Sequence, residues 1–98
     1  EPIYDLSDIQ NSHQVKVVKS QSGRALYFSR VSIPAYSKPN PGMHYRHIGL
    51  YAYRADFLRD FRTWEPTPLE QFERLEQLRA LEHDRLIQVD VALDLKLF

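Results

Sequence analysis

Residues 15–30 read VKVVKSQSGRALYFSR, and this stretch decides the fold. Val15 and Val17 begin a run of β-branched residues that is typical of a strand. A second apolar run, Ala25–Arg30, follows with leucine, tyrosine and phenylalanine in succession. Gly23 lies between the two runs and tolerates the positive φ that a tight turn requires. The stretch therefore predicts a β-hairpin.

The remaining segments alternate between loops, helices and strands. Prolines stiffen the backbone and remove hydrogen-bond donors, so the proline-rich stretch after the hairpin is expected to be a loop. Apolar residues at helical spacing predict helices, and alternating apolar residues predict strands. Thr67, Pro68 and Glu70 are typical of a helix start. The predicted elements are a helical turn at 6–9, a loop at 31–43, a strand at 45–53, helices at 55–62 and from 67 to about 82 or 83, and a strand at 87–93.

The order of these elements, β-β-loop-β-α-α-β, indicates an α/β fold with a mixed sheet. A chain of 98 residues allows one domain at most, so residues 1–98 are expected to form a single segment. Several short strands in so small a chain leave more sheet edge open than a small domain usually does. We therefore expect further chain or a second subunit to cover that edge.

Composition narrows the class of protein. Thirteen basic and thirteen acidic residues give zero net charge, which argues against binding to nucleic acid or to an anionic membrane surface. The chain has no cysteine, so disulfides are excluded and a cytoplasmic location is expected. No apolar run reaches membrane-spanning length. The chain begins at Glu1 without an initiator methionine, which favours a fragment or a processed chain.

Three polar residues near the hairpin, Arg30, His47 and Tyr51, are candidates for ligand binding. His44 and His47 lie three apart on the predicted strand and therefore point to opposite faces, so they cannot share a metal ion. His47 shares a face with Tyr51, and Arg30 ends the hairpin nearby. An imidazole, a phenol and a guanidinium would suit a carboxylate and several hydroxyl groups. An ordinary polar sheet face explains the same pattern.

Glu76 and Gln77 lie at the margin of the apolar stripe of the long predicted helix. There they could face the hydroxyl groups of a sugar. Glu76 also lies three residues before Arg79, so an exposed helical ion pair of little energetic value explains it equally well. The pattern does not choose between the two. The sequence contains no glycine-rich phosphate loop and no GxGxxG motif.

Four stretches together resemble one enzyme family. They are VKVV, ALYFSR and IP at 15–18, 25–30 and 33–34, RHIGLYAYR at 46–54, PTPLE at 66–70 and LEQLR at 75–79. They occur in the order and near the spacing of the CMP-Kdo synthetases, which activate 3-deoxy-manno-octulosonate (Kdo), over about residues 8–93. The resemblance implies an α/β fold like that of the nucleotide-diphospho-sugar transferases.

The resemblance also implies a reaction, in which CTP and Kdo give CMP-Kdo, a precursor of lipopolysaccharide, and pyrophosphate. Mg²⁺ serves as the cofactor of the full-length enzymes. Five residues match family positions that contact Kdo: Arg30, His47, Tyr51, Glu76 and Gln77. The resemblance assigns no catalytic residue and no metal ligand to this chain, and it implies a homodimer whose contact includes residues 45–53.

The chain also departs from the family pattern. The nucleotide loop (IPARxxSTRLPGKPL) and the metal-binding QGDEP segment do not occur, and the sequence ends before the expected VDTPEDL. Asp90 and Asp94 echo that last segment only loosely and are not assigned to metal. We therefore expect the 98-residue chain alone to bind no Mg²⁺ and to transfer no cytidylyl group. The alternative is a stand-alone dimerisation or interaction module that derives from the same family.

Overall fold

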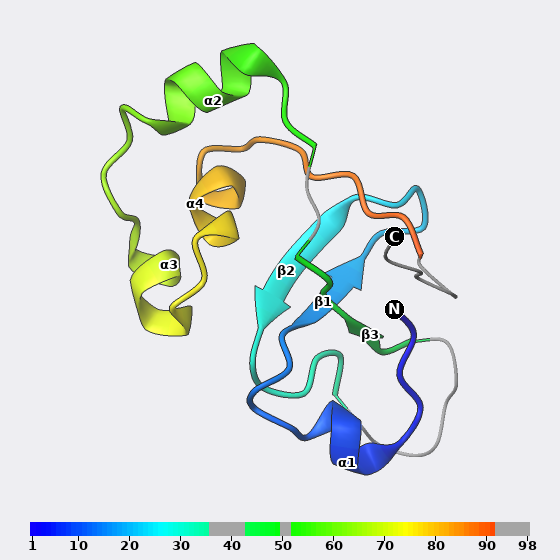
Figure 1. Ribbon diagram of the computed structural model, residues 1–98. Coiled ribbons are helices and arrows are strands. Elements are labelled where there is room, and N and C mark those ends of the chain that lie inside the picture. The colour runs from blue at the N-terminus through cyan, green and yellow to red at the C-terminus, as the bar shows by residue number, and fades with distance from the viewer. Residues whose placement is uncertain (36–42, 50–51, 92–98) are drawn as a thin grey trace, which may run out of the picture.

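The protein is described by a computed structural model that covers residues 1–35, 43–49 and 52–91. A small sheet and α1 occupy one side of the molecule, and α2, α3 and α4 gather on the other (Figure 1). The elements are α1 (Leu6–Ile9), β1 (Lys16–Lys19), β2 (Ala25–Ser29), β3 (Tyr45–Arg46), α2 (Ala55–Phe61), α3 (Pro68–Glu73) and α4 (Gln77–Glu82). The predicted α/β class is confirmed.

The predicted hairpin is confirmed. β1 and β2 pair antiparallel, with Val17 opposite Phe28, and the strand order is β2-β1-β3. Gly23 has a φ of 92° in the connecting turn. A Cβ atom there would lie 2.5 Å from Nε2 of Gln88. The positive φ therefore favours glycine at this turn, whereas the Gln88 side chain could move aside for a Cβ atom.

The outer edge of β3 is covered by the first residues of the chain. The amide of Ile3 donates to the carbonyl of His44 at 3.0 Å, and the amide of Arg46 donates to the carbonyl of Glu1 at 2.7 Å. Pro2 forms an isolated bridge with Tyr45. The chain thus supplies from its own N-terminus part of the edge protection that the sequence had led us to expect from a partner.

The predicted strand at 45–53 is wrong beyond its first residues. Of the described residues in this range, only Tyr45 and Arg46 form a strand, and residues 50–51 lie outside the described part. The amide of His47 still donates to the carbonyl of Val15 at 2.7 Å. Because β1 begins at Lys16, no strand remains for the following residues to pair with. Alternation of apolar residues alone therefore did not make a strand here.

The predicted closing strand at 87–93 is also wrong within the described residues, which end at 91. Gln88 forms only an isolated bridge with Arg24. The amide of Val89 donates to the carbonyl of Gly23 at 2.7 Å. The segment thus meets β2 at the hairpin turn, where the backbone curves away and offers no continuous ladder.

The predicted helix from 67 to about 83 is interrupted. Arg74 adopts the left-handed conformation, with φ 57° and ψ 47°, and ends α3. The interruption separates the apolar stripe into two parts. Leu75 and Leu78 are buried against the sheet, whereas Leu69 and Phe72 on α3 are exposed.

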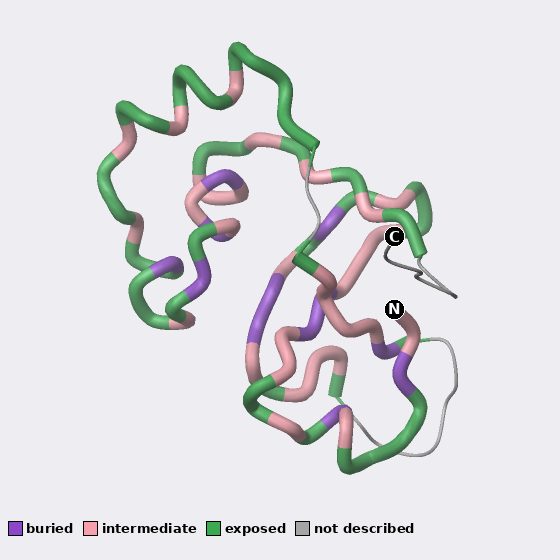
Figure 2. The backbone as a smooth tube through the Cα atoms, in the orientation of Figure 1, coloured by how far each residue is buried: buried purple, intermediate pink, exposed green. Residues whose placement is uncertain are grey.

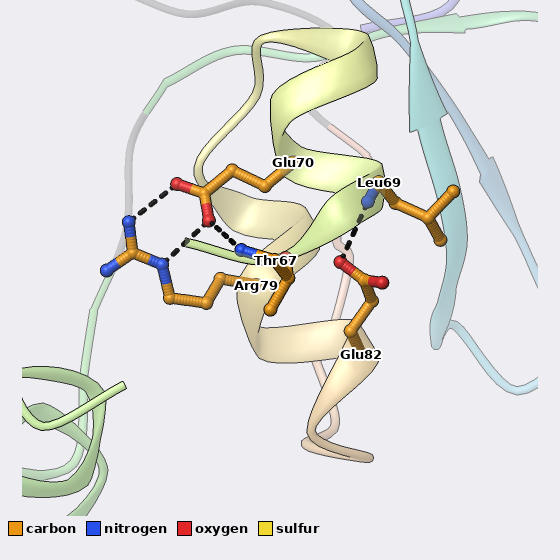
Figure 3. Close-up of polar contacts among 5 residues, drawn as sticks. All are labelled: Thr67, Leu69, Glu70, Arg79 and Glu82. Carbon is orange, nitrogen blue, oxygen red and sulfur yellow. Dashed lines mark hydrogen bonds and ion pairs between the residues drawn. The ribbon is translucent and has the colours of Figure 1, made fainter. Parts of the chain in front are cut away.

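The start of α3 is as predicted, with Pro68 in its first turn. The amide of Thr67 donates to Oε1 of Glu70 at 3.0 Å, so the glutamate reaches back to the residue before the helix (Figure 3). This satisfies one of the amide groups that the first turn of a helix leaves without an internal partner.

The core lies between the hairpin and the α3–α4 unit. It comprises Val17, Ala25, Phe28, Leu75 and Leu78. α2 contributes no buried residue, and its tube shows only exposed and intermediate positions (Figure 2). The predicted helix at 55–62 is therefore confirmed, but it packs loosely on the rest of the chain.

Candidate functional site

A cavity of about 650 Å³ lies between α2, the first turn of α4 and residues 85–88. Its volume falls within the range of small-molecule sites in proteins. Its walls include aromatic rings, two arginines, two carboxylates and two side-chain amides. This mixture of apolar faces and hydrogen-bonding groups is typical of a site for a polar small molecule.

Two of the five predicted sugar contacts line this cavity. Glu76 precedes α4 and is exposed, and Gln77 is the first residue of α4 and is half-buried. The ion pair between Glu76 and Arg79 that was weighed from the sequence is not formed, because the ion pair of Arg79 is with Glu70. The Glu76 carboxylate therefore faces the cavity with no ion pair to another described residue.

An aromatic cluster forms one wall of the cavity. The rings of Tyr53 and Phe57 stack with centroids 5.7 Å apart, and Phe61 lies 5.6 Å from Phe57. Behind them Trp64 stacks on His83 at 3.8 Å. Sequence reasoning noted Phe57 and Phe61 as helical residues but missed this wall. The spacing of four and three residues between Phe57, Phe61 and Trp64 was the available signal.

Arg85 connects α2 to the segment after α4. Its guanidinium forms an ion pair with Asp60, and its Cζ atom lies 5.4 Å from the Trp64 ring and 6.0 Å from the Phe57 ring. A guanidinium over an aromatic face is held by the quadrupole of the ring. Sequence analysis did not identify Arg85, and these contacts fix it as part of the cavity wall.

His47 lines a second, smaller cavity of about 110 Å³. Its ring meets the Phe28 ring edge-on, with centroids 5.3 Å apart. Burial lowers the pKa of His47, and the charge of the N-terminal amine lowers it further. Ile87 and Gln88 line both cavities, so the two sites are neighbours.

The other two predicted contacts are not brought to these cavities by the described residues. The side chain of Arg30 lines neither of them, and Tyr51 lies outside the described part of the chain. Arg30 follows β2 at the end opposite the hairpin turn, while the larger cavity involves residues 85–88, which meet that turn.

Lys16 is fully buried and joins the loop between α1 and β1 to the residue that follows β2. Its ammonium donates to the carbonyl of Gln14 at 2.7 Å, to that of Arg30 at 2.7 Å and to that of Asn11. Burial lowers the pKa of Lys16, and the nearby charge of Arg30 adds to this effect. Sequence analysis placed Lys16 in a strand but gave no sign of this role.

Glu73 fastens α3 to β2. Its carboxylate accepts from the Tyr27 hydroxyl at 3.0 Å and from the Ser29 hydroxyl at 2.8 Å. Burial raises the pKa of Tyr27, and the bond to Glu73 raises it further. These bonds fix where the chain turns from α3 into Glu76 and Gln77, and sequence analysis did not anticipate them.

Clustered metal ligands and membrane-spanning helices are both absent from the described residues. Within residues 1–35, 43–49 and 52–91, no group of three or more histidine, aspartate or glutamate side chains comes together as a metal site would require. In the same residues, no helix has the length and apolar character needed to cross a bilayer.

Comparison with known proteins identifies relatives of this architecture. A family model described as cytidylyltransferase matches residues 1–87. The 3-deoxy-manno-octulosonate cytidylyltransferase of Aeromonas hydrophila is 50% identical over 100 residues, covering 95% of this chain and 40% of the relative. That of Polynucleobacter necessarius is 51% identical over 94 residues, covering 93% of this chain and 37% of the relative.

A solved structure agrees with these relatives. It is CMP:2-keto-3-deoxy-manno-octonic acid synthetase complexed with CTP, which superposes with a TM-score of 0.84 at 34% identity. The match covers 91% of this chain and 36% of that one. The chain thus spans about 40% of the length of the curated relatives it matches. By its family-model match, this chain belongs to the cytidylyltransferase family, and these relatives bear out the resemblance to CMP-Kdo synthetases.

Proposed function

We propose that this chain is the sugar-binding portion of a cytidylyltransferase that converts Kdo and CTP to CMP-Kdo and pyrophosphate. The names of its relatives and the CTP complex of its structural neighbour support this reaction. The proposed product is a lipopolysaccharide precursor, and the proposed location is the cytoplasm.

The observation that carries the proposal is that Glu76 and Gln77 line one cavity of suitable size. A carboxylate accepts hydrogen bonds from sugar hydroxyls, and a side-chain amide both donates and accepts. Aromatic rings such as Tyr53 and Phe57 offer apolar faces to the C–H groups of a sugar ring. The cavity therefore combines the contacts that a polyhydroxylated ligand requires.

In the proposed reaction the anomeric hydroxyl of Kdo attacks the α-phosphorus of CTP. A bond forms between that oxygen and the phosphorus, and the bond to the β-phosphate oxygen breaks, so that pyrophosphate leaves. Phosphoryl-type transfers depend mainly on positioning and on charge stabilisation. Mg²⁺ would supply charge stabilisation in the whole enzyme, and we assign it to no residue of this chain. The part of this chain is to hold the nucleophile in place.

Binding of Kdo to the isolated chain tests the sugar site. Ligand-observed NMR should detect Kdo binding, and Glu76→Gln should weaken it by about tenfold, since a hydrogen bond to a charged group is lost. Gln71→Leu is the matched control, because Gln71 is exposed on α3 and does not line the cavity. Equal affinities for the two variants would contradict the assignment of Glu76.

The second part of the proposal is that the chain alone transfers no cytidylyl group. An assay of CMP-Kdo formation from CTP, Kdo and Mg²⁺ should give no product above background with the 98-residue chain. A full-length relative in the same buffer is the positive control. Product formation by the chain alone would contradict this part while leaving the sugar site intact.

We also propose that α2 and the segment before it form the two-fold contact of a homodimer. α2 buries none of its residues within the chain, and Tyr53 and Leu58, which also line the rim of the larger cavity, are 52% and 43% exposed. A two-fold contact buries the same patch on both subunits. Sedimentation should therefore give a dimer that Leu58→Glu dissociates. Leu69→Glu is the control, at a leucine 41% exposed on α3, and a monomeric wild-type chain would contradict the contact.

A further inference from the structure

An acidic sugar needs a cation for its carboxylate as well as groups for its hydroxyls. Guanidinium groups bind carboxylates through two parallel hydrogen bonds, which makes arginine the preferred partner. Arg54 and Arg85 are candidates because they line the larger cavity, and Arg30 is a candidate because it matches a family sugar contact.

Two of these arginines are poorly suited to the larger cavity. Arg30 does not line it, and its backbone carbonyl is held by the buried ammonium of Lys16 at 2.7 Å. Arg85 does line it, but its charge is already compensated by the ion pair with Asp60. Breaking that pair to bind a ligand would leave Asp60 without its cation.

Arg54 is the remaining guanidinium of the cavity wall. Arg54 is the N-cap residue immediately before α2, and its backbone carbonyl accepts a hydrogen bond from the amide of Leu58 at 3.2 Å. Its side chain lines the cavity together with Glu76 and Gln77, and it makes no ion pair or hydrogen bond with other described residues. Its donors are therefore available to a ligand.

We infer that Arg54 binds the carboxylate of the acidic sugar in the cavity that Glu76 and Gln77 line. The inference rests on the proposed function, since it names the residue that selects an acidic sugar over a neutral one at the same site. The two carboxylates of the wall, Asp56 and Glu76, would repel a carboxylate placed against either of them. The sugar is therefore oriented with its acid group at the guanidinium of Arg54 and its hydroxyl groups toward Asp56 and Glu76.

The test compares Kdo with its methyl ester, which has the same hydroxyl groups and no negative charge. NMR titration of the wild-type chain should show that Kdo binds about tenfold more tightly than the ester, as the gain of a charged hydrogen bond predicts. Arg54→Gln should remove this preference by weakening the binding of Kdo and leaving the ester unchanged. Its denaturation midpoint should equal that of the wild type, because the Arg54 side chain holds no other part of the chain.

Two further variants complete the design. Arg59→Gln is the matched control, because Arg59 is an exposed arginine of α2 that does not line the cavity, and it should keep the preference. Arg30→Gln should also keep it. Loss of the preference in Arg30→Gln with its retention in Arg54→Gln would overturn the inference.

The remaining outcomes separate the inference from the proposed function. Equal binding of acid and ester by the wild-type chain would overturn the role of Arg54 and leave the sugar cavity standing. Failure of the wild-type chain to bind either compound would overturn the proposed sugar site, and the inference with it.

Discussion

The carboxylate of Glu70 accepts two hydrogen bonds from the guanidinium of Arg79, at 2.8 Å from Nε and 2.6 Å from Nη2 (Figure 3). The same carboxylate accepts the amide of Thr67 at 3.0 Å. One side chain thus joins the first turn of α3 to α4 across the bend at Arg74. Both side chains of the pair are nearly buried, at 10% and 13% exposure, so solvent screens their interaction little.

Replacement of Arg79 by lysine should destabilise the protein by about 1–2 kcal/mol, because lysine cannot make the two parallel hydrogen bonds. The bond to Arg79 lowers the pKa of Glu70. The stabilisation is therefore full above the ordinary pKa of a glutamate and is lost as the pH falls through the lowered value. Urea denaturation at neutral and acidic pH measures this, and Glu65→Gln is an exposed control. If wild type and Arg79→Lys differed in unfolding free energy by the same amount at acidic pH as at neutral pH, the pairing would be contradicted.

Lys16→Met should destabilise the protein by at least about 2 kcal/mol, since it leaves the carbonyls that the ammonium satisfies without a buried partner. Methionine is close to lysine in volume, so packing changes little. Lys19→Met is the matched control on the same strand, where the ammonium lies 5.2 Å from the Tyr45 ring and is worth under about 1 kcal/mol. Equal midpoints in urea for the two variants would show that the buried ammonium contributes nothing.

His47 should make the protein less stable in mild acid. Because burial lowers its pKa below the usual 6.5, the folded chain binds this proton less readily than the unfolded chain. The stability that the neutral His47 ring contributes is therefore present above pH 6.5 and is lost as the pH falls through the lowered pKa of the folded chain. NMR titration of the His47 ring measures the pKa directly. His47→Gln should flatten the pH dependence of stability over this window, and an unchanged slope would count against the assignment.

Arg74→Gly should stabilise the protein by about 0.5–1 kcal/mol, because glycine adopts the left-handed conformation without the strain that a Cβ atom causes. Arg62→Gly provides a control of opposite sign. Arg62 ends α2 in the right-handed conformation, with φ −64°, so glycine there should only add freedom to the unfolded chain and destabilise. Thermal denaturation of both variants compares the two effects, and a shift in the same direction would refute the account of the bend.

The hairpin was predictable because neighbouring residues determine it. The valines of β1 and Gly23 specify strand and turn without reference to the rest of the chain. The bend at Arg74 was not predictable, since the leucine spacing continues through it and arginine carries no preference for the left-handed region. The predicted strand at 45–53 was wrong for another reason. Its length depends on where β1, the strand with which it pairs, begins, and residues 45–53 themselves carry no information about that.

The candidate site was predictable only in part. Glu76 and Gln77 were found through resemblance to relatives, and they do line a common cavity. Arg30 matched the same relatives and lies elsewhere in the described chain. The ion pair of Arg85 with Asp60 joins residues far apart in sequence, and no local pattern indicates such a pair. Charged residues that meet only through the tertiary fold need coordinates to be recognised.

The position of Pro2 has a practical consequence for handling the protein. Pro2 bridges Tyr45 at the outer margin of the sheet and, as a proline, has no amide to offer to another strand. Residues 1–3 therefore protect this sheet edge against strand-by-strand aggregation between molecules. Proteolysis that removes residues 1–3 would expose the edge. Preparations that keep residues 1–3 intact should stay dispersed at higher concentration.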